Sequence, residues 1–68
     1  MNDEKNVKLL NGLIEISIDG VEGFKKCADD ANDPKLKLYF QDRANSCAEA
    51  VRTLNTKVRQ CGGEPNTM

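Results

Sequence analysis

The sequence of 68 residues contains no histidine and no tryptophan. Histidine is the side chain most used as a general base and as a transition-metal ligand, so its absence excludes the Glu-x-x-His motif of di-metal sites and every His-activated nucleophile. The three cysteines do not form the Cys-x-x-Cys spacing of thiol redox sites. We therefore expect no enzymatic activity, no bound metal and no cofactor.

Neither sign of charge dominates, and no long apolar run is present. Ten basic residues stand against eleven acidic ones, which argues against nucleic acid or an anionic membrane as a partner. The basic residues near the centre are diluted by acids, because Asp29, Asp30 and Asp33 lie between Lys25-Lys26 and the pair Lys35 and Lys37. No apolar run approaches the length of a membrane span, and Met1–Glu4 is not the opening of a signal peptide. These features predict a cytoplasmic protein.

The chain is divided at its centre by Asn32-Asp33-Pro34. Asn32 suits the left-handed conformation that closes a helix, Asp33 suits an N-cap, and Pro34 suits a first helical position. Two arms of similar length joined by so short a link predict an all-α fold, an antiparallel helical hairpin. We expect one domain over residues 1–68: a helix over about 3–31, a turn at 32–33, a helix over about 34–61 and a tail over 62–68.

Each arm has apolar residues at alternating three- and four-residue spacing, the pattern of two packed helices. Asn2 or Asp3 is expected to cap the first helix, and Gly62 to end the second. The predicted seam of the first arm is Val7, Leu10, Ile14, Val21, Phe24, Ala28 and Ala31, interrupted by Ser17. The seam of the second is Leu36, Phe40, Ala44, Cys47, Val51, Leu54, Val58 and Cys61.

A second apolar strip lies beside the first seam and consists of Leu9, Leu13, Ile16 and Cys27. Seam and strip together cover roughly 180° of the first helix, which is wider than one partner helix needs. Two helices of a short chain bury one seam and seldom reach useful stability alone. We therefore predict self-association of two hairpins into a homodimeric four-helix bundle.

Three glycines interrupt the first helix, and each costs up to about 1 kcal/mol relative to alanine. Three interpretations are open. The glycines could allow another helix to approach closely, Asp19-Gly20 could form a kink, or the glycines could be neutral substitutions tolerated in a helix that its seam holds. The predicted interface residues are Leu9, Gly12, Ile16, Gly20, Gly23 and Cys27.

The three cysteines are expected to lie too far from one another to form a disulfide within the chain. In an antiparallel hairpin, residues whose numbers sum to about 65 lie opposite one another, which places Cys27 near Leu38, Cys47 near Ile18 and Cys61 near Glu4. No intrachain disulfide is expected, and three free thiols fit a reducing compartment. Cysteine as a small core residue and cysteine in an intermolecular disulfide both remain open.

Four segments together resemble an uncharacterised bacterial family, a ferritin-like four-helix-bundle domain of unknown function. The segments are Leu9-Leu10-Asn11-Gly12-Leu13-Ile14, Asp19-Gly20-Val21-Glu22-Gly23-Phe24, Asp33-Pro34-Lys35-Leu36 and Gly62-Gly63-Glu64-Pro65. The resemblance extends from about Leu9 to Pro65 and implies a ferritin-like fold. Family members continue through two further helices, so this chain corresponds to a natural half-length form or to a fragment.

Two classes of function remain. The first is a structural or interaction module that forms a bundle by self-association. The alternative is a ferritin-like protein that binds a metal or a small apolar ligand, or half of a longer ferritin-like domain. The missing histidines favour the first, as does the placement of Glu15, Asp19, Glu22 and Glu49 on predicted outward faces.

Overall fold

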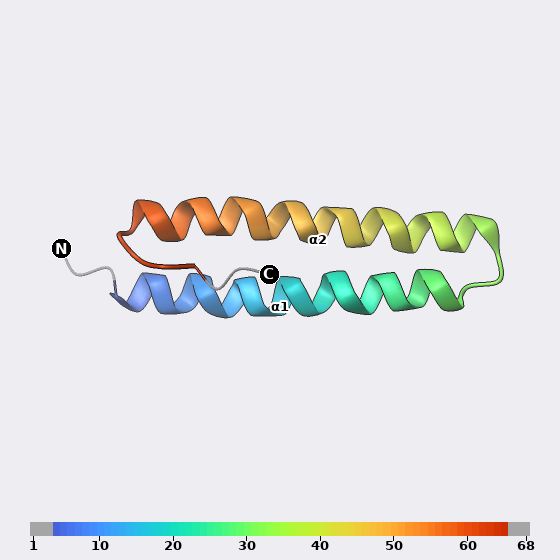
Figure 1. Cartoon of the computed structure of the whole chain (residues 1–68), viewed down its shortest axis with the longest axis horizontal. Coiled ribbons are helices and arrows are strands. Elements are labelled where there is room, and N and C mark those ends of the chain that lie inside the picture. The colour runs from blue at the N-terminus through green and yellow to red at the C-terminus, as the bar shows by residue number, and fades with distance from the viewer. Residues whose placement is uncertain (1–3, 66–68) are drawn as a thin grey trace.

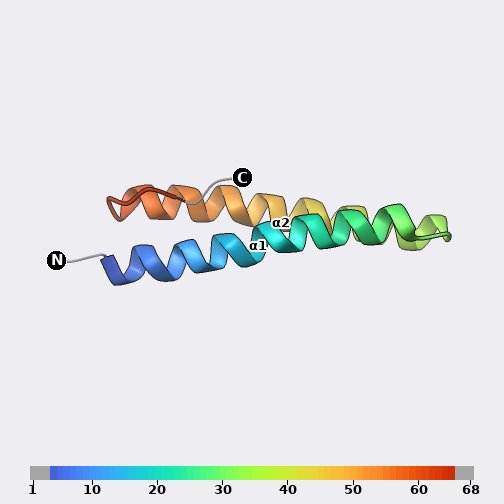
Figure 2. The ribbon, with the colours of Figure 1, turned by 60° about the horizontal axis from the view of Figure 1, so that its bottom comes forward.

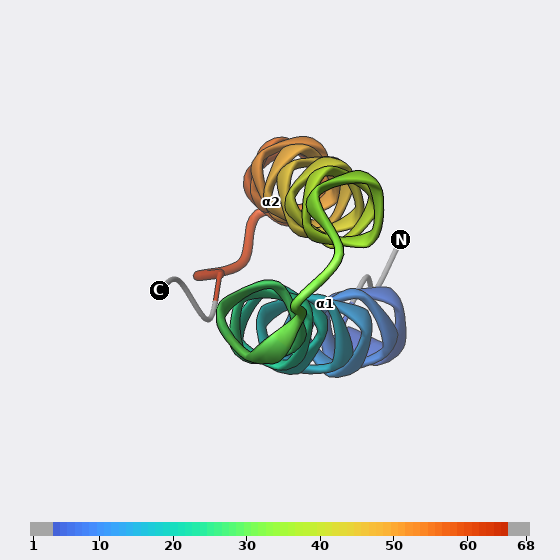
Figure 3. The same cartoon turned by 90° about the vertical axis from the view of Figure 1, so that its right-hand side faces the viewer.

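A computed structural model describes residues 4–65 of the chain. Two long helices, α1 (Glu4–Asp30) and α2 (Pro34–Gln60), run antiparallel and pack along their length as a rod of 51 × 13 × 13 Å (Figure 1). This confirms the predicted all-helical hairpin, and no strand occurs within residues 4–65. The expected cap at Asn2 or Asp3 and the end of the tail lie outside the described residues. The turned views show that the helices cross at a small angle (Figures 2 and 3).

The turn between the helices is fixed by Asp33 and Pro34. Asp33 is extended, with φ −89° and ψ 123°, and its carboxylate accepts a hydrogen bond of 3.0 Å from the backbone N–H of Lys35. Pro34 then begins α2, as predicted. The expected left-handed Asn32 is wrong, because no described residue other than glycine has a positive φ. The residue before a proline is restricted to extended conformations, and the chain reverses through that extended Asp33 instead.

The other end of α2 has a left-handed glycine cap. Gly62 has φ +82°, and its N–H donates to the carbonyl of Arg59 over 3.0 Å. The N–H of Gly63 donates to the carbonyl of Val58, also over 3.0 Å. These two bonds form a Schellman motif, in which the left-handed residue is usually glycine because a Cβ is strained there.

After this cap, the chain folds back onto α1 (Figures 1 and 3). A Cβ at Gly63 would lie 2.6 Å from a methyl group of Val7, so this close approach requires glycine. The side-chain amide of Asn11 donates a hydrogen bond of 3.1 Å to the carbonyl of Glu64. Residues 62–65 therefore cover the flank of α1 that carries Val7 and Asn11.

The core between the helices is small. The buried apolar side chains are Ile14, Val21, Ala28, Ala44, Val51 and Val58, all of them predicted seam positions. Within residues 4–65, only Ile14, Val51 and Val58 have less than 2% of their surface exposed. Phe24 and Phe40 stack across the hairpin with ring centroids 6.3 Å apart.

One predicted seam residue is exposed, since 45% of the surface of Leu36 is accessible to solvent. It stands in the first turn of α2, beside the reversal of the chain, on the edge of the seam. The small residues Ala28 and Ala31 are the seam positions that α1 offers at this end. They leave its side chain partly uncovered.

Candidate functional site

The most unusual surface of the hairpin is an exposed apolar flank of α1. Leu9, Leu13 and Ile16 are 61%, 49% and 68% exposed, and Cys27 is exposed as well. With about 100° between successive helical residues, these four lie on one flank, next to the seam that faces α2. The second apolar strip predicted from the sequence is therefore present at the surface.

Helix α2 adds exposed apolar residues to the same side of the hairpin. Tyr39 is 57% exposed, and its ring meets that of Phe40 edge to face at 5.7 Å. In an antiparallel pair, the flanks that precede the seam on the two helical wheels lie on the same side. Leu36 and Tyr39 therefore share a side with Leu9 and Ile16. We call the surface formed by these residues, Leu13 and Cys27 the apolar face.

A groove between the two helices confirms that their flanks lie on one side. It has a volume of about 370 Å³ and lies at the open end of the hairpin, away from the turn. Its lining residues come from both helices: Asn6, Leu9 and Leu10 of α1, with Lys57, Gln60 and Cys61 at the end of α2. The spacing of residues in the sequence does not predict this groove, because its lining residues come from opposite ends of the chain.

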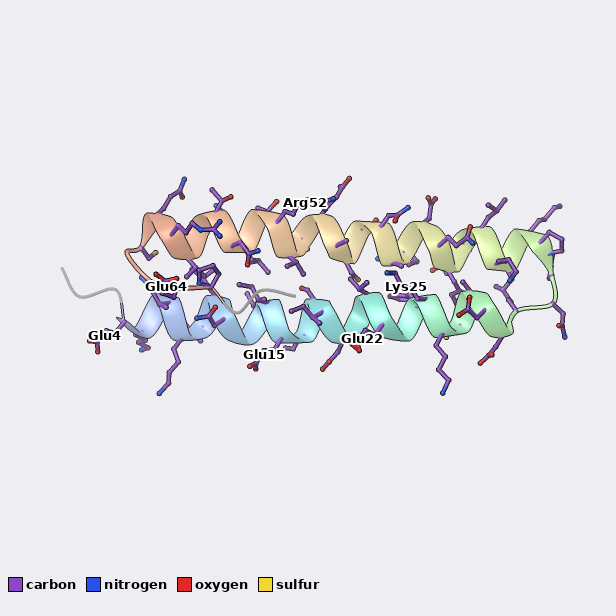
Figure 4. The ribbon with its side chains drawn as sticks, in the orientation of Figure 1. Glu4, Glu15, Glu22, Lys25, Arg52 and Glu64 are labelled. Carbon is purple, nitrogen blue, oxygen red and sulfur yellow. The ribbon has the colours of Figure 1, made fainter. Side chains whose placement is uncertain are left out.

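The opposite side of the hairpin is polar and partly covered. The returning segment 62–65 lies there against Val7 and Asn11. Glu15 and Glu22 project from α1 away from α2 (Figure 4). The carboxylates that could have lined a di-metal site, Glu15, Asp19, Glu22 and Glu49, are all exposed. Within residues 4–65, no group of three or more acidic or cysteine side chains is placed to hold a metal ion.

The glycines divide into two groups. A Cβ added at Gly12 or Gly23 would have no atom within 4 Å. These two positions are open, as an interface with another molecule requires. Gly20 is different, because a Cβ there would lie 3.0 Å from the sulfur of Cys47. The helix that approaches Gly20 closely is therefore α2 of the same chain. Helix α1 runs without interruption through this position.

The physical reason is the position of Gly20 on the helical wheel. It lies between the buried Val21 and the exposed Ile16, on the side nearer to α2. The predicted interface set of Leu9, Gly12, Ile16, Gly20, Gly23 and Cys27 stays a prediction, and the hairpin itself covers none of these residues fully.

The three thiols are free and stand at different heights. Cys27 is exposed, whereas Cys47 and Cys61 are half-buried. Cys47 lies against Gly20, within one helical turn of the predicted neighbour Ile18. Cys27 is near the turn, Cys47 is at the middle of α2, and Cys61 is at the open end.

Comparison with known proteins identifies the family but no activity. A family described as a domain of unknown function (DUF2383) matches residues 5–68. The chain belongs to this family. No curated protein and no solved structure matches the chain. Within the described part of this DUF2383 domain, neither helix is long and apolar enough to cross a membrane.

Proposed function

We propose that this DUF2383 chain is a structural or interaction module, and that two copies associate through the apolar face into a four-helix bundle. The observation that carries the proposal is an imbalance between exposed and buried apolar side chains. Six large ones are exposed within residues 4–65, five of them on the apolar face: Leu9, Leu13, Ile16, Leu36 and Tyr39. Only three side chains are fully buried there. An exposed patch of this kind is typical of an interaction site.

The shape of the patch favours helices as the partner. Each helix of a four-helix bundle has two neighbours and buries two adjacent flanks. In this hairpin, α1 has one flank against α2 and its next flank apolar and open. A second hairpin supplies two helices at once, which matches a patch that extends over both α1 and α2. The resemblance to ferritin-like domains supports the same architecture, because two copies of this chain provide four helices.

The chemistry of the chain gives no support to the ligand-binding alternative. Histidine is absent, and the carboxylates on α1 and α2 that could have served a di-metal site point outward. The free thiols fit the reducing interior of a cell, and we place the protein in the cytoplasm on that ground. Because the basic and acidic residues nearly balance, we propose neither nucleic acid nor a membrane as its partner.

Native mass spectrometry of the full chain tests this proposal. Two chains of 7.5 kDa each should give a species of about 15 kDa, with no added mass from metal or ligand. Elemental analysis of the dialysed protein should find no stoichiometric iron, manganese or zinc. A dimer that retains about one metal ion or one apolar small molecule per chain would replace the proposal with the ligand-binding alternative. A species of one chain would contradict self-association itself.

A further inference from the structure

The apolar face is not uniform along the hairpin. At the open end it is hollow, because the groove lies there between Leu9 and Cys61. At the turn end stands its largest side chain, Tyr39, which is 57% exposed and projects from α2 beside Leu36. A surface with a hollow at one end and bulk at the other is self-complementary when a second copy is inverted.

We propose that the two hairpins pair in inverted orientation, with the turn end of each copy over the open end of its partner. The inference rests on the proposed self-association and specifies its geometry. The two-fold axis is then perpendicular to the long axis of the hairpin and passes near its middle. Such an interface is isologous, so each copy fills the groove of the other with the same side chains.

Positions along the helices support this pairing. The middle residue of α1 is Ser17 and that of α2 is Cys47. With a rise of 1.5 Å per residue, Tyr39 lies about 12 Å from the middle towards the turn, and Leu9 lies about 12 Å from it towards the open end. An inverted partner therefore brings its Tyr39 to the height of Leu9, which lines the groove.

The reverse arrangement, with both turns at the same end, matches less well. It places the two grooves opposite each other at the open end and leaves their combined volume unfilled. It also brings the two Lys57 side chains to the same height, where like charges repel. In the inverted pair, Lys57 instead lies near the exposed ring of the partner copy's tyrosine, and a cation is attracted to the face of such a ring.

Cross-linking along α2 distinguishes the two orientations. The variant carries Leu36→Cys with Cys27→Ser and Cys47→Ala, so that its thiols are at position 36 and at the native Cys61. These positions are 25 residues apart, one in the first turn of α2 and the other at its C-cap, or about 37 Å, so no link between them can form within a chain. A short bismaleimide followed by peptide mapping should join position 36 of one copy to position 61 of the other. The variant with Cys61 as its single thiol should stay uncross-linked, because two inverted copies hold these thiols at opposite ends.

The cross-links test the orientation of the two hairpins, and the mass tests whether they associate. Links from 36 to 36 and from 61 to 61, or a dimer without the mixed link, would overturn the inverted orientation and leave the dimer standing. A single-chain mass in native mass spectrometry would remove the proposed function and this inference with it. Circular dichroism checks that the variant is helical. If the variant is not helical, the single substitution Cys47→Ala leaves Cys27 and Cys61 as the thiols. The inverted pair then predicts a link between Cys27 of one copy and Cys61 of the other, and the other pairing predicts no link between these two positions.

Discussion

Replacing Ile16 with glutamate should dissociate the dimer and largely unfold the chain. Ile16 is 68% exposed in the single hairpin and lies one residue from the middle of α1. In the proposed dimer, the two copies of this residue lie close to the two-fold axis. Glutamate would bury a carboxylate from each copy near the other, at several kcal/mol per charge. We expect the dissociation constant to rise by at least about 1,000-fold, as measured by analytical ultracentrifugation.

The matched control is Leu38→Glu. Leu38 is 65% exposed, nearly as much as Ile16, but its position on the wheel of α2 is outside the apolar face. The change in charge and the loss of an apolar side chain are the same, so the control removes general effects of both. Leu38→Glu should leave the mass and the helicity unchanged. Equal dissociation by the two variants would show that Ile16 has no special place in an interface.

Truncating the core should have the next largest effect. Ile14 has no exposed surface and packs with Val51 and Val58 in the main cluster. Ile14→Ala removes three carbon atoms from this cluster, and a buried truncation of this kind lowers the free energy of unfolding by about 2–5 kcal/mol. Since the core holds so few fully buried side chains, we expect most of the chain to be unfolded at 25 °C. Urea denaturation followed by circular dichroism measures the loss.

Leu38→Ala serves as the comparison for this variant. It removes the same number of carbon atoms from a side chain that is already mostly in water, so its effect should stay within about 0.5 kcal/mol. If Ile14→Ala is no more destabilising than Leu38→Ala, then the packing between α1 and α2 is not what holds the hairpin.

Much of this fold was predictable from local signals. The capping carboxylate of Asp33 and the fixed φ of Pro34 are enough to mark the start of α2. The three-and-four spacing of Val7, Leu10 and Ile14 identifies the buried face of α1, because burial between two helices requires that period. The same spacing of Val51, Leu54 and Val58 identifies the buried face of α2. The exposed strip of Leu9 and Ile16 follows from the same wheel, as apolar positions beyond what one partner covers.

The remaining features depend on tertiary contacts that no local pattern carries. Gly20 shares its flank with Ile16 on the wheel, and only the packing of α2 shows that Cys47 covers it. Gly63 reads as part of a stop signal, whereas its contact with Val7 turns the following residues back onto α1. The groove beside Leu9 depends on where both helices end. None of these contacts has a period or a motif in the sequence.

If the hairpin folds by pairing with a second copy, its mass and its helicity must change together. Sedimentation equilibrium of the wild-type chain over a range of micromolar concentrations, with circular dichroism at the same concentrations, gives mass and helicity together. We expect a dimer whose helicity falls on dilution as the mass falls towards one chain. A chain that is monomeric and cooperatively folded at micromolar concentration would contradict it.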